Sequence, residues 1–410
     1  MIRIDADLLI PGRGEPVRDG AVVLDGARIA YVGPASRAPR SDGRVAKVRT
    51  VMPGLWDCHM HFLGVRDLHL ERVLSIPAAV LAARAAKAAE DVLAAGFTSV
   101  REVGGYGVYL TQVIAEGTLN GPNVYAAGSI LSQTGGHGDI HSAPLATVHD
   151  FSAHEGFLQL CDGVAECLKA VRLQLRRGAR VIKVCASGGV LSEVDHPVHQ
   201  QFTDQELKAI VDEAGRQDRV VAAHCHGKPG IMAALRAGCR TIEHGTYLDE
   251  EAAAAMKDTK AVLVSTRSIV ARIMKDLDKV PAYGAAKMRA MADQHLASMR
   301  VARAAGVTVA MGTDFATTGA DTQVPHGKNG EELGHLVGAG YTPLEAIEAA
   351  TASAPLTLGP QAPRSGLLAK SYDADVIALD ADPLADIGIL ADPEHVTHVW
   401  KAGRLAKGAA

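Results

Sequence analysis

Short apolar stretches recur through the middle of the chain and alternate with stretches of helical periodicity. One ends at His59, and seven more are typical of buried strands, at residues 98–103, 123–127, 180–184, 220–224, 241–244, 262–265 and 308–312. Residues 81–95 have apolar positions about 3.6 residues apart and end at Gly96, as expected of a helix. The pattern predicts eight strands with helices between several of them.

Two helix starts in this region have specific signals. Thr203-Asp-Gln-Glu206 is a capping-box sequence that opens a helix toward Gln217. Thr342 precedes Pro343, and proline is favoured at the first helical position. Eight strand–helix units in one run predict an α/β fold, a (β/α)8 TIM barrel over residues 52–360. Functional groups of such a barrel lie at the carboxyl ends of the strands.

The two ends of the chain have a different pattern. Residues 6–10, 21–24, 28–32, 375–379 and 395–400 are predicted strands, and Asp25-Gly26 is a predicted hairpin turn. Each end is too short to bury a core of its own. We therefore expect residues 1–51 and 361–410 to combine into one small β-sandwich domain. Two unrelated terminal modules are the less favoured alternative.

The composition excludes several classes of function. The 410 residues are 48% hydrophobic and carry a formal net charge of −4, without the basic stripe that nucleic-acid binding needs. No apolar segment approaches the length of a membrane span, and the N-terminus lacks the pattern of a secretory signal, so a cytoplasmic location is expected. Six cysteines without a C-x-x-C pair favour buried reduced thiols.

Side chains that can bind a metal stand at the ends of the predicted strands. His59 and His61 are two residues apart on one strand, so both imidazoles can point to the same side. Taken singly, each such residue has an ordinary structural role, as a snorkelling lysine, a hydrogen-bonded histidine or a helix cap. Their shared position at strand ends instead favours one metal centre, made from His59, His61, Lys183, His224, His244 and Asp314.

Five motifs at these positions resemble the amidohydrolase superfamily, in order along nearly the whole chain. They are His59-Met-His61, Val181-Ile-Lys183, Ala223-His-Cys-His226, Ile242-Glu-His-Gly245 and Gly312-Thr-Asp314. Segments 134–139, 183–192 and 243–249 are similar to the prolidase and carboxypeptidase-like branch. That branch hydrolyses dipeptides and N-acyl amino acids, and some members cleave the amide of ochratoxin A. The resemblance implies a hydrolase acting on a small-molecule amide or dipeptide.

The resemblance also implies the ligand set. His59-Met-His61 and Asp314 would hold the more buried of two divalent metal ions, and His224 and His244 the more exposed one. Lys183, carboxylated to N6-carboxylysine, would bridge both ions. Burial lowers the pKa of a lysine amine, and the neutral amine reacts with carbon dioxide. Imidazole and carboxylate ligands suit Zn²⁺ first, with Mn²⁺ or Co²⁺ as alternatives.

The mechanism that the resemblance implies uses a metal-bridging hydroxide. Asp314 takes its proton and passes it to the leaving amine. His137, in a glycine-flanked loop, and His226, just beyond a predicted ligand, are candidates to bind the substrate carboxylate or the oxyanion. Either could instead only support a ligand. Relatives commonly assemble, often as octamers, so a homo-oligomer is expected.

Two further segments border the predicted site. Residues 267–300 are a predicted helical lid, in which Arg267 follows a strand closely enough to reach the pocket and the other basic side chains form a solvated face. Gly188-Gly189 is not part of a phosphate-binding loop pattern. We expect these glycines to give the backbone room near the pocket.

Three other functions fit parts of this pattern. A deaminase of the superfamily usually lacks the bridging lysine and has a Glu shortly after the His224 position, where this chain has Cys225-His-Gly-Lys228. A lactonase or phosphotriesterase can share the two-metal site, and only the segments that include residues 134–139 and 187–192 favour amide cleavage. A non-catalytic scaffold would have lost ligands, and none is missing. The sequence therefore favours a two-metal amidohydrolase.

Overall fold

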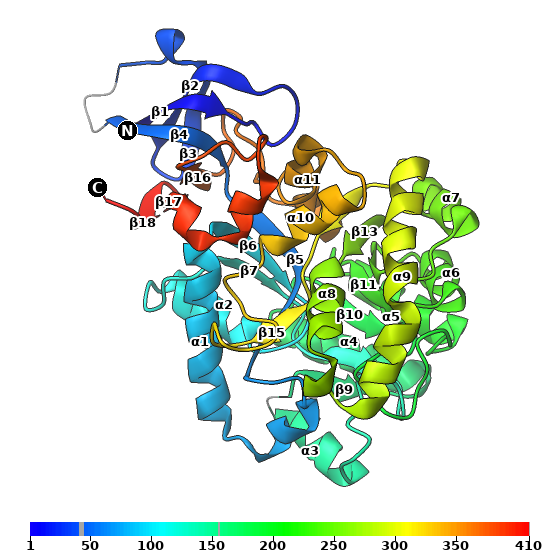
Figure 1. Cartoon of the computed structure of the whole chain (residues 1–410). Coiled ribbons are helices and arrows are strands. Elements are labelled where there is room, and N and C mark those ends of the chain that lie inside the picture. The colour runs from blue at the N-terminus through cyan, green and yellow to red at the C-terminus, as the bar shows by residue number, and fades with distance from the viewer. Residues whose placement is uncertain (41–44, 155, 410) are drawn as a thin grey trace.

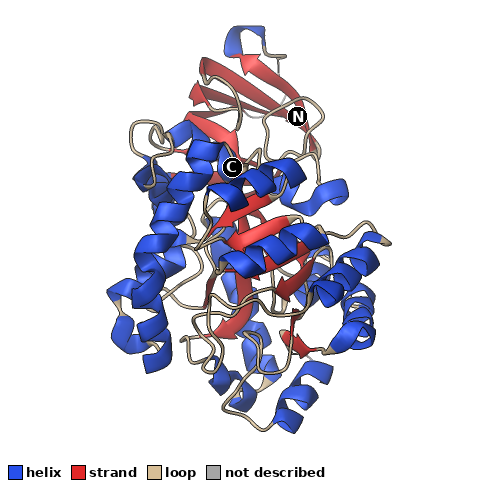
Figure 2. Cartoon of the chain, turned by 90° about the vertical axis from the view of Figure 1, so that its right-hand side faces the viewer, coloured by secondary structure: helices blue, strands red, loops and turns tan. Residues whose placement is uncertain are grey.

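The computed structural model describes residues 1–40, 45–154 and 156–409. A sheet containing both ends of the chain lies at one side of the molecule, and the rest is a larger α/β body in which helices surround the strands (Figures 1 and 2). Among these residues no helix has the length and apolarity to cross a membrane. All six cysteines are free and buried, as expected.

The terminal sheet has seven strands, in the order β18-β17-β16-β4-β1-β2-β3. They are β1 (Ile2–Leu9), β2 (Val17–Asp25), β3 (Arg28–Pro34), β4 (Val45–Pro53), β16 (Val376–Leu379), β17 (Val396–Lys401) and β18 (Arg404–Lys407). β4 pairs in parallel with β1 and antiparallel with β16, which joins the two chain ends. The predicted union of the ends is confirmed. Because β4 bridges both groups of strands, they form one sheet where a sandwich of two was expected. The domain limits at 51 and 361 stay predictions.

The α/β body holds its parallel strands in two sheets, with the orders β14-β13-β12-β11-β10-β8-β9 and β15-β5-β6-β7. The strands are β5 (Leu55–Val65), β6 (Phe97–Glu102), β7 (Asn123–Ala126), β8 (Ile130–Ser132), β9 (Leu158–Leu160), β10 (Ile182–Cys185), β11 (Val221–Cys225), β12 (Thr241–His244), β13 (Val262–Ser265), β14 (Val309–Met311) and β15 (Phe315–Thr317). The predicted α/β class is confirmed, but in the described residues the ladders do not join into a closed barrel. Between β7 and β8 the backbone N–H of Ser129 donates to the side chain of Gln174 rather than to a strand.

Helices cover the strands through their apolar faces. They are α1 (Ala78–Ala94), α2 (Gly107–Ala115), α3 (Leu145–His154), α4 (Gly163–Arg176), α5 (Asp204–Gly215), α6 (Lys228–Ala237), α7 (Glu250–Thr259), α8 (Arg267–Lys275), α9 (Ala282–Ala305), α10 (Glu331–Gly338) and α11 (Pro343–Ala349). The two predicted helix starts are confirmed, since Thr203 and Thr342 each form a complete capping box.

Strand register brings the site residues to one edge. In the parallel pairing Cys185 lies beside His224, and Cys225 lies beside His244. The carboxyl ends of β10, β11 and β12 are therefore level. The predicted strand at 308–312 is β14, and β15 then pairs with β5 through Phe315 and Met60. This pairing places Asp314, between β14 and β15, against the middle of β5.

Candidate metal centre

Asp314 lies against the two histidines of β5. Its Oδ1 is 3.1 Å from Nε2 of His61 and 3.3 Å from Nε2 of His59. The main-chain N–H groups of Thr313 and Asp314 both donate to the carbonyl oxygen of His59, at 3.0 and 2.7 Å. The Asp314 side chain is 24% exposed and that of His59 only 1%, so the carboxylate forms the open side of this group.

The other predicted ligands lie on β10, β11 and β12, with Lys183 two residues before the end of β10 and His224 and His244 at or next to the ends of β11 and β12. Nζ of Lys183 is 3.5 Å from Nε2 of His59, and Nδ1 of His224 is 3.0 Å from Nε2 of His244. Two trios have donor atoms within 4.8 Å of one another, namely His224, His226, His244 and His59, His244, Asp314. His244 belongs to both trios. The six predicted ligands therefore converge in one cluster, which His226 joins.

The outer ring nitrogen of three of these histidines contacts an oxygen that can only accept a hydrogen bond. The pairs are His59 Nδ1 with the Glu243 carboxylate at 2.7 Å, His61 Nδ1 with the Gly104 carbonyl at 2.8 Å, and His224 Nε2 with the Gly188 carbonyl at 3.1 Å. These nitrogens therefore donate, and in a neutral imidazole the other nitrogen has a lone pair. Each of those lone pairs faces the centre, as in histidines that bind metals.

A buried ion pair between Arg101 and Glu243 holds the ring of His59 in place. Nη2 of Arg101 donates to both oxygens of Glu243 at 2.7 Å, and its Nε donates to the carbonyl of Cys58 at 2.6 Å. Arg101 and Glu243 are both 0% exposed. Burial alone would raise the pKa of Glu243, but Arg101 and His59 hold it well below the usual value. Glu243 is thus an ionised acceptor that fixes the ring of His59.

Asp57 connects β5 to the segment that contains Asp314. Its Oδ1 accepts from the main-chain N–H groups of His59 and Thr313, at 3.0 and 3.1 Å. Its Oδ2 accepts from Oγ1 of Thr313 at 2.6 Å and from Nδ2 of Asn329 at 2.7 Å. Asp314 itself has a φ of 60°, a left-handed conformation unusual outside glycine. The four bonds to Asp57 hold the main chain on either side of the centre.

Burial also sets the charge of the cluster. It lowers the pKa of His224 and His244 well below the usual value, and neighbouring positive groups lower it further. It lowers the pKa of Lys183 as well. Burial would raise the pKa of Asp314, but His59 and its neighbour His61 hold it well below the ordinary range. Lone-pair donors around one carboxylate are a ligand set suited to cations.

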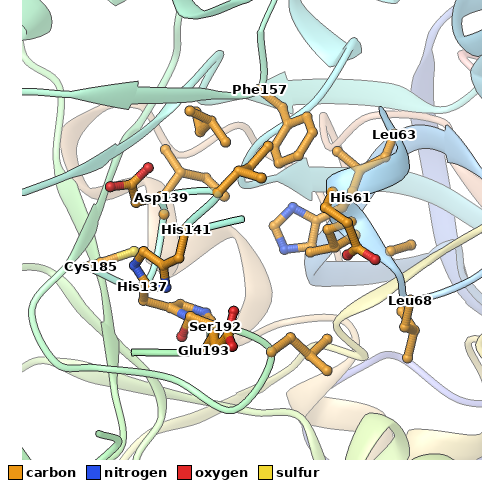
Figure 3. A pocket seen from close by; sticks show the side chains of 18 of the residues that line it. His61, Leu63, Leu68, His137, Asp139, His141, Phe157, Cys185, Ser192 and Glu193 are labelled. Atoms are coloured by element: carbon orange, nitrogen blue, oxygen red, sulfur yellow. The ribbon is translucent and has the colours of Figure 1, made fainter. Parts of the chain in front are cut away.

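A pocket with an empty volume of about 970 Å³ opens beside this cluster (Figure 3). His61, His137 and Asp314 line it, together with apolar side chains that include Leu63, Ile130, Phe157 and Leu191. Nδ1 of His137 is 2.8 Å from Oγ of Ser192, and its ring stacks on that of His224 with centroids 4.2 Å apart. His137 therefore lies where a substrate contact was predicted. His226 is not among the described lining residues and lies within the histidine cluster.

Comparison with known proteins identifies the family. Residues 50–406 match the amidohydrolase family. The chain belongs to that family. Ochratoxinase of Aspergillus niger is 47% identical over 422 residues, which cover 99% of this chain and 86% of that protein. Its crystal structure superposes with a TM-score of 0.93 and 46% identity, covering 100% and 96% of the two chains. A prolidase solved with N-methylphosphonate-L-proline gives a TM-score of 0.88 at 31% identity and full coverage of both.

The amidohydrolase family is metal-dependent, and the relatives named ochratoxinase and prolidase are amide-bond hydrolases of this family. The predictions of the superfamily and of a hydrolase are therefore confirmed. The predicted donor atoms lie close together, and two trios of side chains could each hold a metal ion. The role of each residue, the number of ions and the modification of Lys183 stay predictions.

The predicted lid consists of α8 and α9, and Arg267 belongs to its structure. Nη1 of Arg267 donates to the carbonyl of Ala292 at 2.5 Å, which ties the two helices together. Arg267 is not among the described residues that line the pocket. Lys287 of α9 instead approaches the site, since its Nζ donates to the carbonyls of Ser192 and Asp195 at 2.6 and 2.5 Å. In this amidohydrolase the helix therefore anchors the loop that supports His137.

The supporting residues of the centre were not predicted from the sequence. Arg101 and Glu243 are charged residues inside predicted buried strands, a signal that can be read from the sequence because a buried charge needs a partner. Asp57 stands two residues before His59 and gave a similar signal. Ser192 and Gln201, which bond the ring and main chain of His137, come from loops and gave none.

Proposed function

We propose that this amidohydrolase uses two divalent metal ions, Zn²⁺ first, to cleave the amide bond of dipeptides or N-acyl amino acids. The convergence of the six donors, with imidazole lone pairs facing inward, carries the proposal. When bound, the ions would activate a water and polarise the scissile carbonyl. We also propose that the two parallel sheets are arcs of a (β/α)8 barrel and that the chain forms a homo-oligomer.

The donors fit two ions by their chemistry. His59, His61 and Asp314 would hold one ion, and His224 and His244 the other. Three of the four histidines have an outer nitrogen that donates to a carbonyl or carboxylate, which leaves the inner lone pair for a metal. Without a cation, the inner nitrogens of His59 and His61 face the Asp314 carboxylate at 3.3 and 3.1 Å, an arrangement that a positive ion would stabilise.

Lys183 would bridge the ions as its carbamate. Its side chain is 2% exposed, and burial lowers the pKa of its amine, which favours the neutral form that reacts with carbon dioxide. The amine nitrogen bonds to the carbon of carbon dioxide and loses a proton. The product would be an anion with two oxygen atoms, which are suitable ligands for divalent ions.

Asp314 would move the proton. Its carboxylate lies at the boundary between the histidines and the pocket, so it can reach both an attacking water and the leaving nitrogen. The ionised Oδ1 or Oδ2 accepts a proton from the water as the carbonyl carbon is attacked. The resulting carboxylic acid then gives that proton to the leaving amine.

His137 and His226 would bind the polar end of the substrate. His137 lines the pocket, with Ser192 at its outer nitrogen, and Nδ1 of His226 lies 2.7 Å from Oγ1 of Thr246. The proposed substrate class is consistent with relatives named ochratoxinase and prolidase. Either imidazole could pair with a carboxylate or with the developing oxyanion.

A substrate screen of the zinc-loaded protein tests the proposal. N-acyl amino acids and Xaa-Pro dipeptides are expected to be cleaved, and matched esters, lactones and phosphotriesters to be poorer substrates. Metal analysis should find about two zinc ions per chain. Hydrolysis of lactones or phosphotriesters without amide cleavage would overturn the assignment, and so would a chain that binds no transition metal.

A further inference from the structure

The helix α8 begins at Arg267 without a cap from the residue that precedes it. Thr266 stands at the N-cap position, where a threonine hydroxyl commonly accepts a hydrogen bond from the first turn, but its side chain forms no such bond. Oγ1 of Thr266 lies instead 2.7 Å from Nδ1 of His244, at the end of β12. The hydroxyl therefore orients a histidine of the proposed metal centre.

Glu332 of α10 caps α8 in place of Thr266. Its Oε1 accepts from the main-chain N–H of Arg267 at 3.0 Å, and its Oε2 accepts from the main-chain N–H and the hydroxyl of Ser268, both at 2.7 Å. Glu332 is 0% exposed. The first N–H groups of a helix have no partner within it, and the helix dipole favours a negative charge beside them. The buried carboxylate and the start of α8 thus stabilise each other.

The cap from α10 decides where the Thr266 hydroxyl points. In one rotamer it meets His244, and in a capping rotamer it would turn back into the first turn of α8. An N-cap side chain normally bonds the N–H of the second or third helical residue. Because Glu332 already accepts from the N–H of Ser268, the second residue of α8, Thr266 gains little by turning back.

We propose that Glu332 is a positioning residue of the metal centre, which caps α8 from α10 and so leaves the Thr266 hydroxyl to hold His244. This inference rests on the proposed function, in which His244 binds a metal ion. Glu332 is not among the described residues that line the pocket, so it acts through Thr266 alone. Loss of its carboxylate should let Thr266 turn toward α8 and release the ring of His244.

A double-mutant cycle on zinc affinity tests this chain of contacts. Thr266→Val removes the hydroxyl and should lower zinc affinity about 10–100-fold, the usual effect of losing the partner of a ligand. Glu332→Gln should lower it by up to the same factor. In the Thr266→Val background Glu332→Gln should have no further effect, since the hydroxyl through which it acts is gone. Burial raises the pKa of Glu332 to about 7 despite its bonds from Ser268 and Arg267, so the affinities are measured above that pH by competition with a chelator.

The same cycle on thermal unfolding of the metal-free protein should show coupling of the opposite sign. With Glu332→Gln alone, Thr266 can turn back and cap α8, so the midpoint falls only moderately. The double variant has neither capping side chain, and its midpoint should fall by more than the sum of the two single shifts. Thr266→Ser keeps the hydroxyl and should match wild type in both measurements. If the double variant does not fold, Glu332→Asp, which is too short to reach α8, replaces Glu332→Gln in both cycles.

Glu206→Gln is the matched control. Glu206 accepts from the main-chain N–H of Thr203 at 2.7 Å in the capping box of α5, so the change weakens another helix cap and should leave zinc affinity unchanged. Additive effects in either cycle, or unchanged zinc affinity in Thr266→Val, would overturn the role of Glu332. If wild type binds no zinc, the proposed function fails instead, and the unfolding cycle alone decides the inference.

Discussion

Oε2 of Glu243 lies 2.7 Å from Nδ1 of His59, and both side chains are buried above the guanidinium of Arg101. This carboxylate is neither a proposed ligand nor part of the pocket lining. It nevertheless sets which nitrogen of His59 faces the centre, and it neutralises a charge that would otherwise be buried alone. One residue thus couples the stability of the fold to the geometry of the site.

Glu243→Gln should weaken both metal binding and the stability of the fold. The neutral amide leaves Arg101 without its counter-ion and holds His59 less firmly, so zinc affinity should fall about 10–100-fold. The midpoint of thermal unfolding should fall too, because unpaired buried charges are destabilising. Competition with a chelator and calorimetry measure the two effects. Glu251→Gln changes a carboxylate whose side chain is 70% exposed and should alter neither. Unchanged zinc affinity would remove the positioning role of Glu243.

Lys183→Ala should remove the two-ion site, because it removes the amine whose carbamate is proposed to bridge the two ions. The bound zinc should fall from about two ions to one or none, measured by elemental analysis after dialysis, and activity should be lost. Lys208→Ala, at a surface position, is the control. A variant that retains two ions and full activity contradicts the bridge.

Asp314→Asn should preserve the fold and lower kcat by about 10²–10⁴, the usual contribution of a proton-transfer group. Asparagine suits this position because it tolerates the left-handed φ of 60°. Steady-state kinetics with circular dichroism separate catalysis from folding. Turnover near that of wild type would disprove the proton transfer.

His137→Ala should mainly raise KM, since the ring lines the pocket without being a proposed ligand. The zinc content should stay at the wild-type value. His154→Ala, an exposed histidine on α3, serves as the comparison. An unchanged KM for every cleaved substrate would make His137 a bystander.

Gly189→Ala should act through His137. A Cβ at Gly189 would lie 2.0 Å from Nδ1 of His137, so the imidazole must move. We expect a raised KM without loss of zinc. Gly334→Ala, where a Cβ meets nothing within 4 Å, controls for the added methyl group. Equal kinetics in both variants would show that the pocket tolerates the displacement. This close approach agrees with the expectation that Gly188-Gly189 gives the backbone room near the pocket.

The sequence predicted which side chains lie together at the centre because strand periodicity and strand ends are local features. His59 and His61 share a strand face, and parallel register brings Lys183, His224 and His244 to one edge. Closure of the barrel could not be judged in the same way, since it depends on pairings such as that of Ser129, whose N–H bonds a distant glutamine. β8, β9 and β15, each three residues long, were not predicted.

The roles of His137 and Arg267 depended on loops and helices. His137 lines the pocket because Ser192, Gln201 and Lys287 hold its loop in place. None of these three contacts follows from a periodic pattern in the sequence. From its place just after β13, Arg267 was close enough in the sequence to reach the pocket. It pairs with the main chain of α9 instead, because the helix that follows it lies within reach of the guanidinium.

His244 and Asp314 are both in the left-handed region, with φ of 66° and 60°. Each such residue costs roughly 1–3 kcal/mol, and glycine would occupy either place with less strain. Selection for thermal stability would therefore favour glycine at these two positions, whereas selection for activity would favour His244 and Asp314. A library of variants selected only for thermal stability should accumulate glycine at both positions and lose hydrolase activity.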